Sequence, residues 1–268
     1  MIIQRVQHGV GERGFRSKVT GETVGGPETW SDEDLRANRC DFTEEIRAHP
    51  LWDAYHRERS PDWSKITVPF LSAGNWGGQG LHLRGNVEAF LQSASKKKWL
   101  EVHNLEHWTH YYTDYGLNLQ KEFFAHYLKR IDNGWEKRPR LLLNIRRVDN
   151  TLVHRAEHKW PLARTQWTRL YLDAASKSLR SQPAAEAKLS YAGLGKGVTF
   201  HTAPLEADME ITGPVAAKLH ISSSTSDADL FLVLHVYDPQ GHEIVFSGAQ
   251  HPRTPVSQGW LRASHRAL

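Results

Sequence analysis

Short apolar runs and helical patterns alternate through residues 61–135, and this alternation restricts the fold of the chain more than any other feature. Residues 66–71 form a β-favouring apolar run that ends in a glycine-rich turn, and residues 98–102 form a second one. After each run, large apolar side chains recur at helical spacing, over 87–91 and over 117–131. Strand, helix, strand and helix joined by short loops are typical of a parallel α/β sheet. We therefore predict such a sheet for residues 61–135.

The pattern changes after residue 136, where the helical period ends. Short strands separated by turn signals are predicted at 141–145, 168–172, 198–200, 215–221 and 230–237. Many short strands in succession favour a β-sandwich or jelly roll. We assign residues 136–268 to such a domain.

The first 60 residues have a third character. They are polar and contain many glycines, with short helices predicted from Ser31, Thr43 and Leu51. Because this region offers few apolar residues, it does not form a core of its own. We interpret residues 1–60 as the remnant of a larger helical insertion.

Composition excludes several classes of protein. Cys40 is the single cysteine, so an internal disulfide cannot form. No stretch approaches the ~20 apolar residues of a membrane span, and Met1–Val6 lacks the apolar core of a signal peptide. The net charge is +4, and Lys96–Lys98 is a compact basic run that fits a solvated turn better than a nucleic-acid patch. We predict a cytoplasmic protein without a membrane or nucleic-acid partner.

A histidine directly follows the second predicted strand. The run from Lys98 to Trp108 begins as a strand and opens into a loop that carries His107. The last catalytic strand of an α/β-hydrolase presents its histidine in this way. The alternative is a histidine that merely ends a strand. No G-x-S-x-G occurs in the 268 residues, so the turn that exposes a nucleophilic serine is not encoded.

Over nearly its whole length the chain resembles the cocaine esterase and Xaa-Pro dipeptidyl-peptidase (CocE/NonD) group of serine hydrolases. The matching stretches are Ser60–Trp63, Gly74–Trp76, Leu100–His107, Trp160–Pro161, Ile211–Pro214, Asp227–Phe231 and Gly259–Ser264. Their order and spacing carry the resemblance. It implies the C-terminal part of an α/β-hydrolase domain with a cap remnant, followed by an incomplete jelly-roll β-sandwich. The chain therefore resembles an internal section of the family.

The resemblance also implies a mechanism. Enzymes of this group hydrolyse esters or amides through an acyl-serine intermediate and need no cofactor. His107 falls on the general base, and the serine is expected upstream of Met1. The expected substrate is a small acyl ester or a peptide-like molecule. Missing strands at either end would expose apolar surface, so a complementary chain or a homo-oligomer is a further expectation.

The acid of the triad does not carry over. The family's aspartate position falls on Gly77 and Gly78, which cannot orient an imidazole. Candidates to stand in for the acid are Glu106, Asn75 and Gln79.

Aromatic residues near His107 suggest a pocket. The candidate pocket residues are Trp76, Trp108, Tyr111 and Tyr112. Packing around the following helix is an equally good interpretation of the residues after His107.

Two other functions remain open. One is a non-catalytic, truncated homologue that acts as a binding or interaction module. The other is a zinc hydrolase, because His103, Glu106 and His107 match the H-x-x-E-H motif, with His110 three residues on. Zinc binding by this motif needs both histidines on one helix, whereas the preceding residues indicate a strand. We therefore expect no metal ion at this motif.

Overall fold

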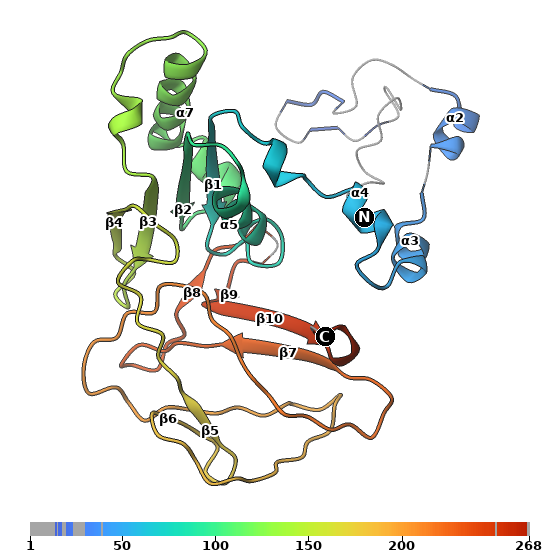
Figure 1. Cartoon of the computed structure of the whole chain (residues 1–268), viewed down its shortest axis with the longest axis vertical. Coiled ribbons are helices and arrows are strands. Elements are labelled where there is room, and N and C mark those ends of the chain that lie inside the picture. The colour runs from blue at the N-terminus through green and yellow to red at the C-terminus, as the bar shows by residue number, and fades with distance from the viewer. Residues whose placement is uncertain are drawn as a thin grey trace. The chain divides into compact units, whose positions relative to one another are not determined.

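The computed structural model describes residues 14, 16–17, 20–23, 30–38, 40–249 and 251–266, in two compact units, 1–61 and 62–268 (Figure 1). The helices of the first unit are α2 (Asp32–Ala37), α3 (Phe42–Ala48) and α4 (Ala54–Glu58). Their N-caps are Ser31, Asp41 and Asp53, whose side chains accept backbone N–H groups of the first turn. Leu35 is the one buried hydrophobic residue among the described residues of this unit, in agreement with the polar character of the sequence.

A four-stranded sheet opens the second unit. Strands β1 (Phe70–Asn75), β2 (Lys98–His103) and β3 (Leu141–Arg146) are parallel, and β4 (Leu152–Glu157) pairs antiparallel with β3. The order is β1-β2-β3-β4. Strand β1 starts at Phe70 and not at residue 66, because Pro69 has no N–H to donate to the neighbouring strand.

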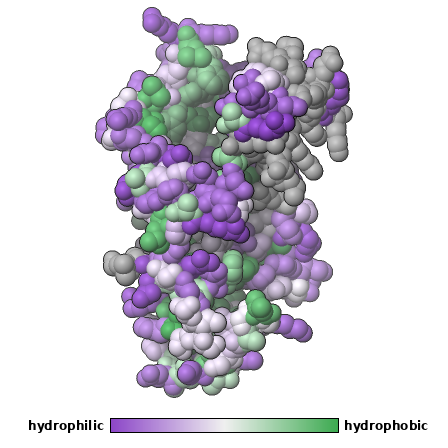
Figure 2. Space-filling view, turned by 90° about the vertical axis from the view of Figure 1, so that its right-hand side faces the viewer, coloured by the Kyte–Doolittle hydropathy of each residue, from purple (hydrophilic) through white to green (hydrophobic). Residues whose placement is uncertain are grey.

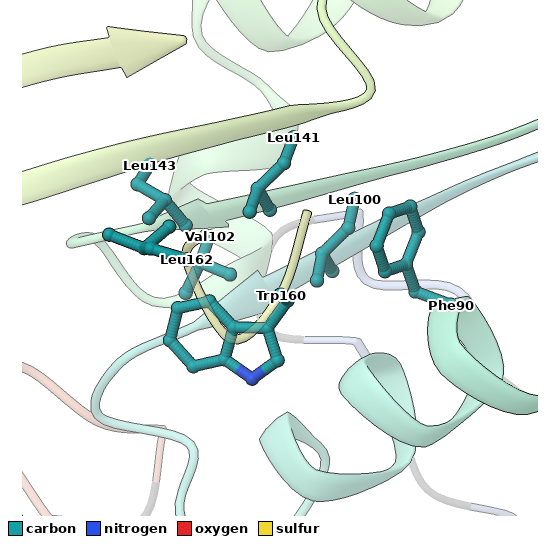
Figure 3. Packing of buried hydrophobic residues seen from close by; sticks show 7 residues of the cluster. All are labelled: Phe90, Leu100, Val102, Leu141, Leu143, Trp160 and Leu162. Atoms are coloured by element: carbon teal, nitrogen blue, oxygen red, sulfur yellow. The ribbon is translucent and has the colours of Figure 1, made fainter. Parts of the chain in front are cut away.

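Helices cover both faces of this sheet. Helix α5 (Leu83–Gln92) packs on one face and α7 (Asp114–Tyr127) on the other, and the short α6 (His107–Tyr111) leads from β2 into α7. Strand β2 alternates between the two faces, as a strand buried on both sides must. One core consists of Phe90, Leu100, Val102, Leu141, Leu143, Trp160 and Leu162 (Figure 3). The other consists of Trp99, Leu119, Phe123 and Trp135.

Strands β3 and β4 lie beyond residue 136, in the segment predicted as a β-sandwich, yet they complete the α/β sheet. Leu141 and Leu143 are fully buried against the α5 side of the sheet. The predicted parallel sheet is therefore present, and it extends about twenty residues further along the chain than its pattern indicated.

The rest of the second unit is β-rich. Three two-stranded antiparallel sheets pair β5 (Tyr171–Asp173) with β6 (Ser178–Arg180), β7 (Asp229–Leu234) with β10 (Ser257–Arg262), and β8 (Val245–Phe246) with β9 (Thr254–Pro255). The helices η2 (Trp63–Lys65), η3 (Trp135–Lys137) and η4 (Ala263–His265) are single 3-10 turns.

Two predicted strands of this region, 198–200 and 215–221, are wrong, because neither stretch forms a strand. Val215 and Ile221 are exposed, so the alternating pattern has no second layer to pack against.

Apolar side chains are visible as green areas among hydrophilic ones on the face shown in Figure 2. In the part of the chain that the structure describes, no helix is long and apolar enough to cross a membrane.

Candidate functional site

The pairing of β1 with β2 determines where His107 lies. The two parallel strands end together, with Asn75 opposite His103. Residues 104–106 turn away from β2, and His107 is the first residue of α6. Since carboxyl ends of parallel strands share one edge of the sheet, His107 and the residues after β1 meet there.

His107 borders a cavity of about 180 Å³ at this edge. Other lining residues are Asn75, Gly78, His82, Asn86 and Ala249. The imidazole of His82 faces that of His107 edge to face, with ring centroids 5.3 Å apart. His82, the N-cap residue of α5, is not among the residues that the sequence analysis predicts for the site. No carboxylate is among the described residues that line the cavity. No hydrogen bond from a described residue to the imidazole of His107 is present.

Asn75 acts as a clamp between three segments. Its Nδ2 donates to the carbonyl of Leu105 and, at 3.2 Å, to the carbonyl of Ser247. The side chain is buried, and its Oδ1 has no partner among the described residues. The amide therefore ties the end of β1 to the loop before His107 and to the β-rich region.

The other two candidates for the acid point elsewhere. Gln79 donates from Nε2 to the carbonyls of Pro255 and Val256, both at 2.9 Å. Glu106 is the N-cap residue of α6, where its backbone carbonyl accepts from His110 at 2.9 Å. Neither side chain contacts the imidazole of His107 through a hydrogen bond that the structure describes. The role of acid remains a prediction for both.

The predicted aromatic pocket separates into two environments. Trp76 donates from Nε1 to the carbonyl of Asn144 at 2.8 Å and packs beside Trp160 and Phe246. The other three aromatic residues are half or more exposed and do not border the cavity: Trp108 and Tyr111 in α6, and Tyr112 at its C-cap. A substrate role for these four residues remains a prediction.

A buried polar cluster lies on the α7 side of β2. Glu101, His103 and His110 offer one ligand atom each within 4.8 Å of one another. His110 Nε2 lies 3.1 Å from Glu101 Oε1, and the rings of His103 and His110 stack with centroids 3.8 Å apart. Burial, followed by the nearby His110 and His107, lowers the pKa of His103 to about 3. Burial and the charge of Glu101 raise the pKa of Tyr115.

This cluster differs from the H-x-x-E-H prediction. His103 ends β2 and His107 begins α6, so the two histidines do not share one helical face. The described group that converges contains His103 but neither Glu106 nor His107. The sequence could have revealed Glu101 only through knowledge that β2 is covered on both faces, because a lone glutamate in an apolar run otherwise indicates an exposed position.

Replacing Asn75 by aspartate is expected to lower the free energy of unfolding by about 3 kcal/mol. The carboxylate cannot donate to the carbonyls of Leu105 and Ser247, and its charge would face both oxygens. Urea unfolding followed by tryptophan fluorescence measures the change. Asn118→Asp, on the exposed face of α7, is the matched control and should shift stability by less than about 0.5 kcal/mol. Equal effects of the two substitutions would contradict a stabilising role for the hydrogen bonds from Asn75.

Comparisons with known proteins are consistent with one another. The family model of the X-Pro dipeptidyl-peptidase C-terminal non-catalytic domain matches residues 133–268. Two crystal structures of a CocE/NonD family hydrolase from Staphylococcus aureus are similar in fold. One has a TM-score of 0.73 at 30% identity and the other 0.75 at 29%. These matches cover 85% and 88% of this chain, but only 42% and 43% of the hydrolase.

Two curated relatives carry the name serine esterase, one from Mycobacterium bovis and one from Mycobacterium tuberculosis. Each is 36% identical over 73 residues, which is 27% of this chain and 10% of the relative. The chain thus spans less than half the length of the solved relatives and about a tenth of the curated ones.

Proposed function

The chain belongs to the CocE/NonD-like hydrolase family, and from this premise we propose that it supplies the general base of a serine-dependent acyl hydrolase. One observation carries the proposal: His107 follows a parallel strand and borders a cavity, and no described residue hydrogen-bonds to its imidazole. Such an imidazole can accept the proton of a serine hydroxyl as the oxygen attacks an acyl carbonyl. The expected substrate is a small acyl ester or a peptide-like amide.

The serine of this hydrolase comes from outside these 268 residues, because the sequence has no G-x-S-x-G turn. Strand β1 supports such an arrangement. It pairs with β2 on one side only among the described strands, so its other edge is free to pair with a further strand. The sheet β1–β4 is then the C-terminal part of an α/β-hydrolase domain. The β-rich region is an incomplete jelly roll, and a complementary chain or second copy is the partner.

A non-catalytic binding module is the second candidate. The supporting observation is that the matching family model describes a non-catalytic domain and covers half of the chain. In this case the β-rich region would bind a partner, and the cavity beside His107 would be a remnant. The single exposed Cys40 is compatible with a cytoplasmic setting for either function.

A fluorophosphonate probe distinguishes the two candidates, because it labels activated serines covalently. The purified chain alone is expected to remain unlabelled. Mixed with the part of the Staphylococcus aureus hydrolase that this chain does not match, it should form a complex that is labelled and that hydrolyses p-nitrophenyl acetate. Heat-denatured protein is the control for non-specific labelling. A stable complex without label or hydrolysis would favour the binding module, and labelling of the chain alone would contradict an external serine.

A further inference from the structure

Three buried polar atoms of the cluster beneath α7 lack partners. They are Glu101 Oε2, His103 Nδ1 and His103 Nε2, with no hydrogen bond to any residue that the structure describes. Glu101 and His103 are only 2% and 1% exposed. Because buried polar atoms are almost always hydrogen-bonded or bound to an ion, this concentration of unpartnered atoms needs a ligand.

We propose that Glu101, His103 and His110 bind a divalent transition-metal ion of the Zn²⁺ type, and that this ion joins β2 to α6. This site is independent of the proposed hydrolase chemistry. It also differs from the H-x-x-E-H motif, since it uses Glu101 and His110 in place of Glu106 and His107.

The ligand types select the ion. Two imidazoles and one carboxylate match the nitrogen and oxygen ligands of zinc. Calcium and magnesium prefer oxygen ligands alone. Three protein ligands leave one of the four tetrahedral positions for a small ligand such as water.

The geometry requires one small movement. Ligands about 2 Å from a shared zinc ion lie within about 4 Å of each other. The pair of Glu101 Oε1 and His110 Nε2 already does so, at 3.1 Å. The His103 ring is stacked parallel to His110 and must turn to direct a nitrogen towards the same point. No described hydrogen bond opposes that turn.

The position of the site indicates a structural role. Glu101 and His103 extend from the same face of β2 as Trp99, which packs beneath α7 against Phe123 and Trp135. His110 reaches this face from α6, the helix that begins with His107. A bound ion would therefore join α6 to the face of β2 that α7 covers.

Metal binding by the purified full chain tests the proposal without any measurement of hydrolysis. The chain is stripped with a chelator, reloaded with Zn²⁺, and analysed for metal content and by zinc X-ray absorption. We expect one zinc ion per chain, scattering from two imidazoles and ligand distances of about 2.0–2.2 Å. Zinc binding should also raise the melting temperature.

Variants locate the ion. Glu101→Gln and His110→Gln are expected to weaken zinc binding at least about 100-fold, more than the loss of an outer-shell partner. His126→Gln is the matched control, because His126 forms a histidine–glutamate pair with Glu136 outside the cluster. Circular dichroism checks that each variant folds, and X-ray absorption on the unaltered chain does not depend on the variants. Absence of stoichiometric zinc, or zinc binding that persists in both cluster variants, would overturn the proposal.

Discussion

Replacing His107 by glutamine is expected to lower the kcat/KM for p-nitrophenyl acetate of the reconstituted hydrolase by about 10²–10⁴-fold. Glutamine has a similar reach and can hydrogen-bond, but it cannot take a proton from serine at neutral pH. The side chain is only half-buried at the first position of α6, so the substitution should leave the fold intact. The loss would then belong to the proton transfer and not to unfolding.

His82 provides the matched control for this experiment. It borders the same cavity and faces His107 at 5.3 Å between ring centroids, yet it lies before α5 and not after a catalytic strand. We expect His82→Gln to reduce kcat/KM less than about tenfold. If the His82 variant lost more activity than the His107 variant, His82 and not His107 would be the general base. If neither substitution had an effect, the cavity would not be the active site.

The sequence predicted well those features that depend on neighbouring residues. The strand predicted at 98–102 is present as β2, and a helix follows it as predicted. That helix ends at Tyr127 and not near residue 131, and the predicted apolar positions Phe124, Leu128 and Ile131 are exposed. His107 does not lie in a loop, because it begins the short helix α6. Strand β1 starts four residues later than the apolar run predicts, because Pro69 has no N–H to donate to a neighbouring strand. Strand β3 was correctly predicted but assigned to the wrong layer. A short apolar run such as 141–145 indicates a strand without identifying the sheet that it joins.

The site was less predictable, because its contacts join residues far apart in the chain. The sequence predicts Asn75 as a substitute for the acid, whereas in the structure its amide donates to backbone carbonyls thirty and more residues away. Glu101 is not recognisable as a site residue from the sequence, since a single charged residue among apolar ones normally indicates a solvated face. It is buried because β2 lies between two helices, and only the complete β-α-β arrangement determines that burial.

Gly77→Ala is expected to lower the free energy of unfolding by about 3 kcal/mol or more, whereas Gly78→Ala should lower it by less than about 1 kcal/mol. A Cβ on Gly77 would lie 2.3 Å from the carbonyl oxygen of Ser247 and 2.7 Å from the backbone nitrogen of Gly248. Backbone atoms cannot move away as a flexible side chain would. At Gly78 the nearest atom is the carbonyl oxygen of Asn75, at 3.1 Å, which a slight adjustment relieves.

This pair of glycines also determines where an acid can be placed. Both occupy the segment where the family's aspartate is expected, and Gly78 borders the cavity of His107. Neither is among the described glycines with positive φ, so the difference between them arises from contacts alone. Urea midpoints of the two alanine variants, measured by tryptophan fluorescence, give the comparison. Similar midpoints would mean that the 247–248 segment does not pack against β1 as the structure shows. A large difference would establish that contact. Gly78 would then be the position at which a carboxylate can reach the cavity, because a side chain there does not push residues 247–248 away from the sheet.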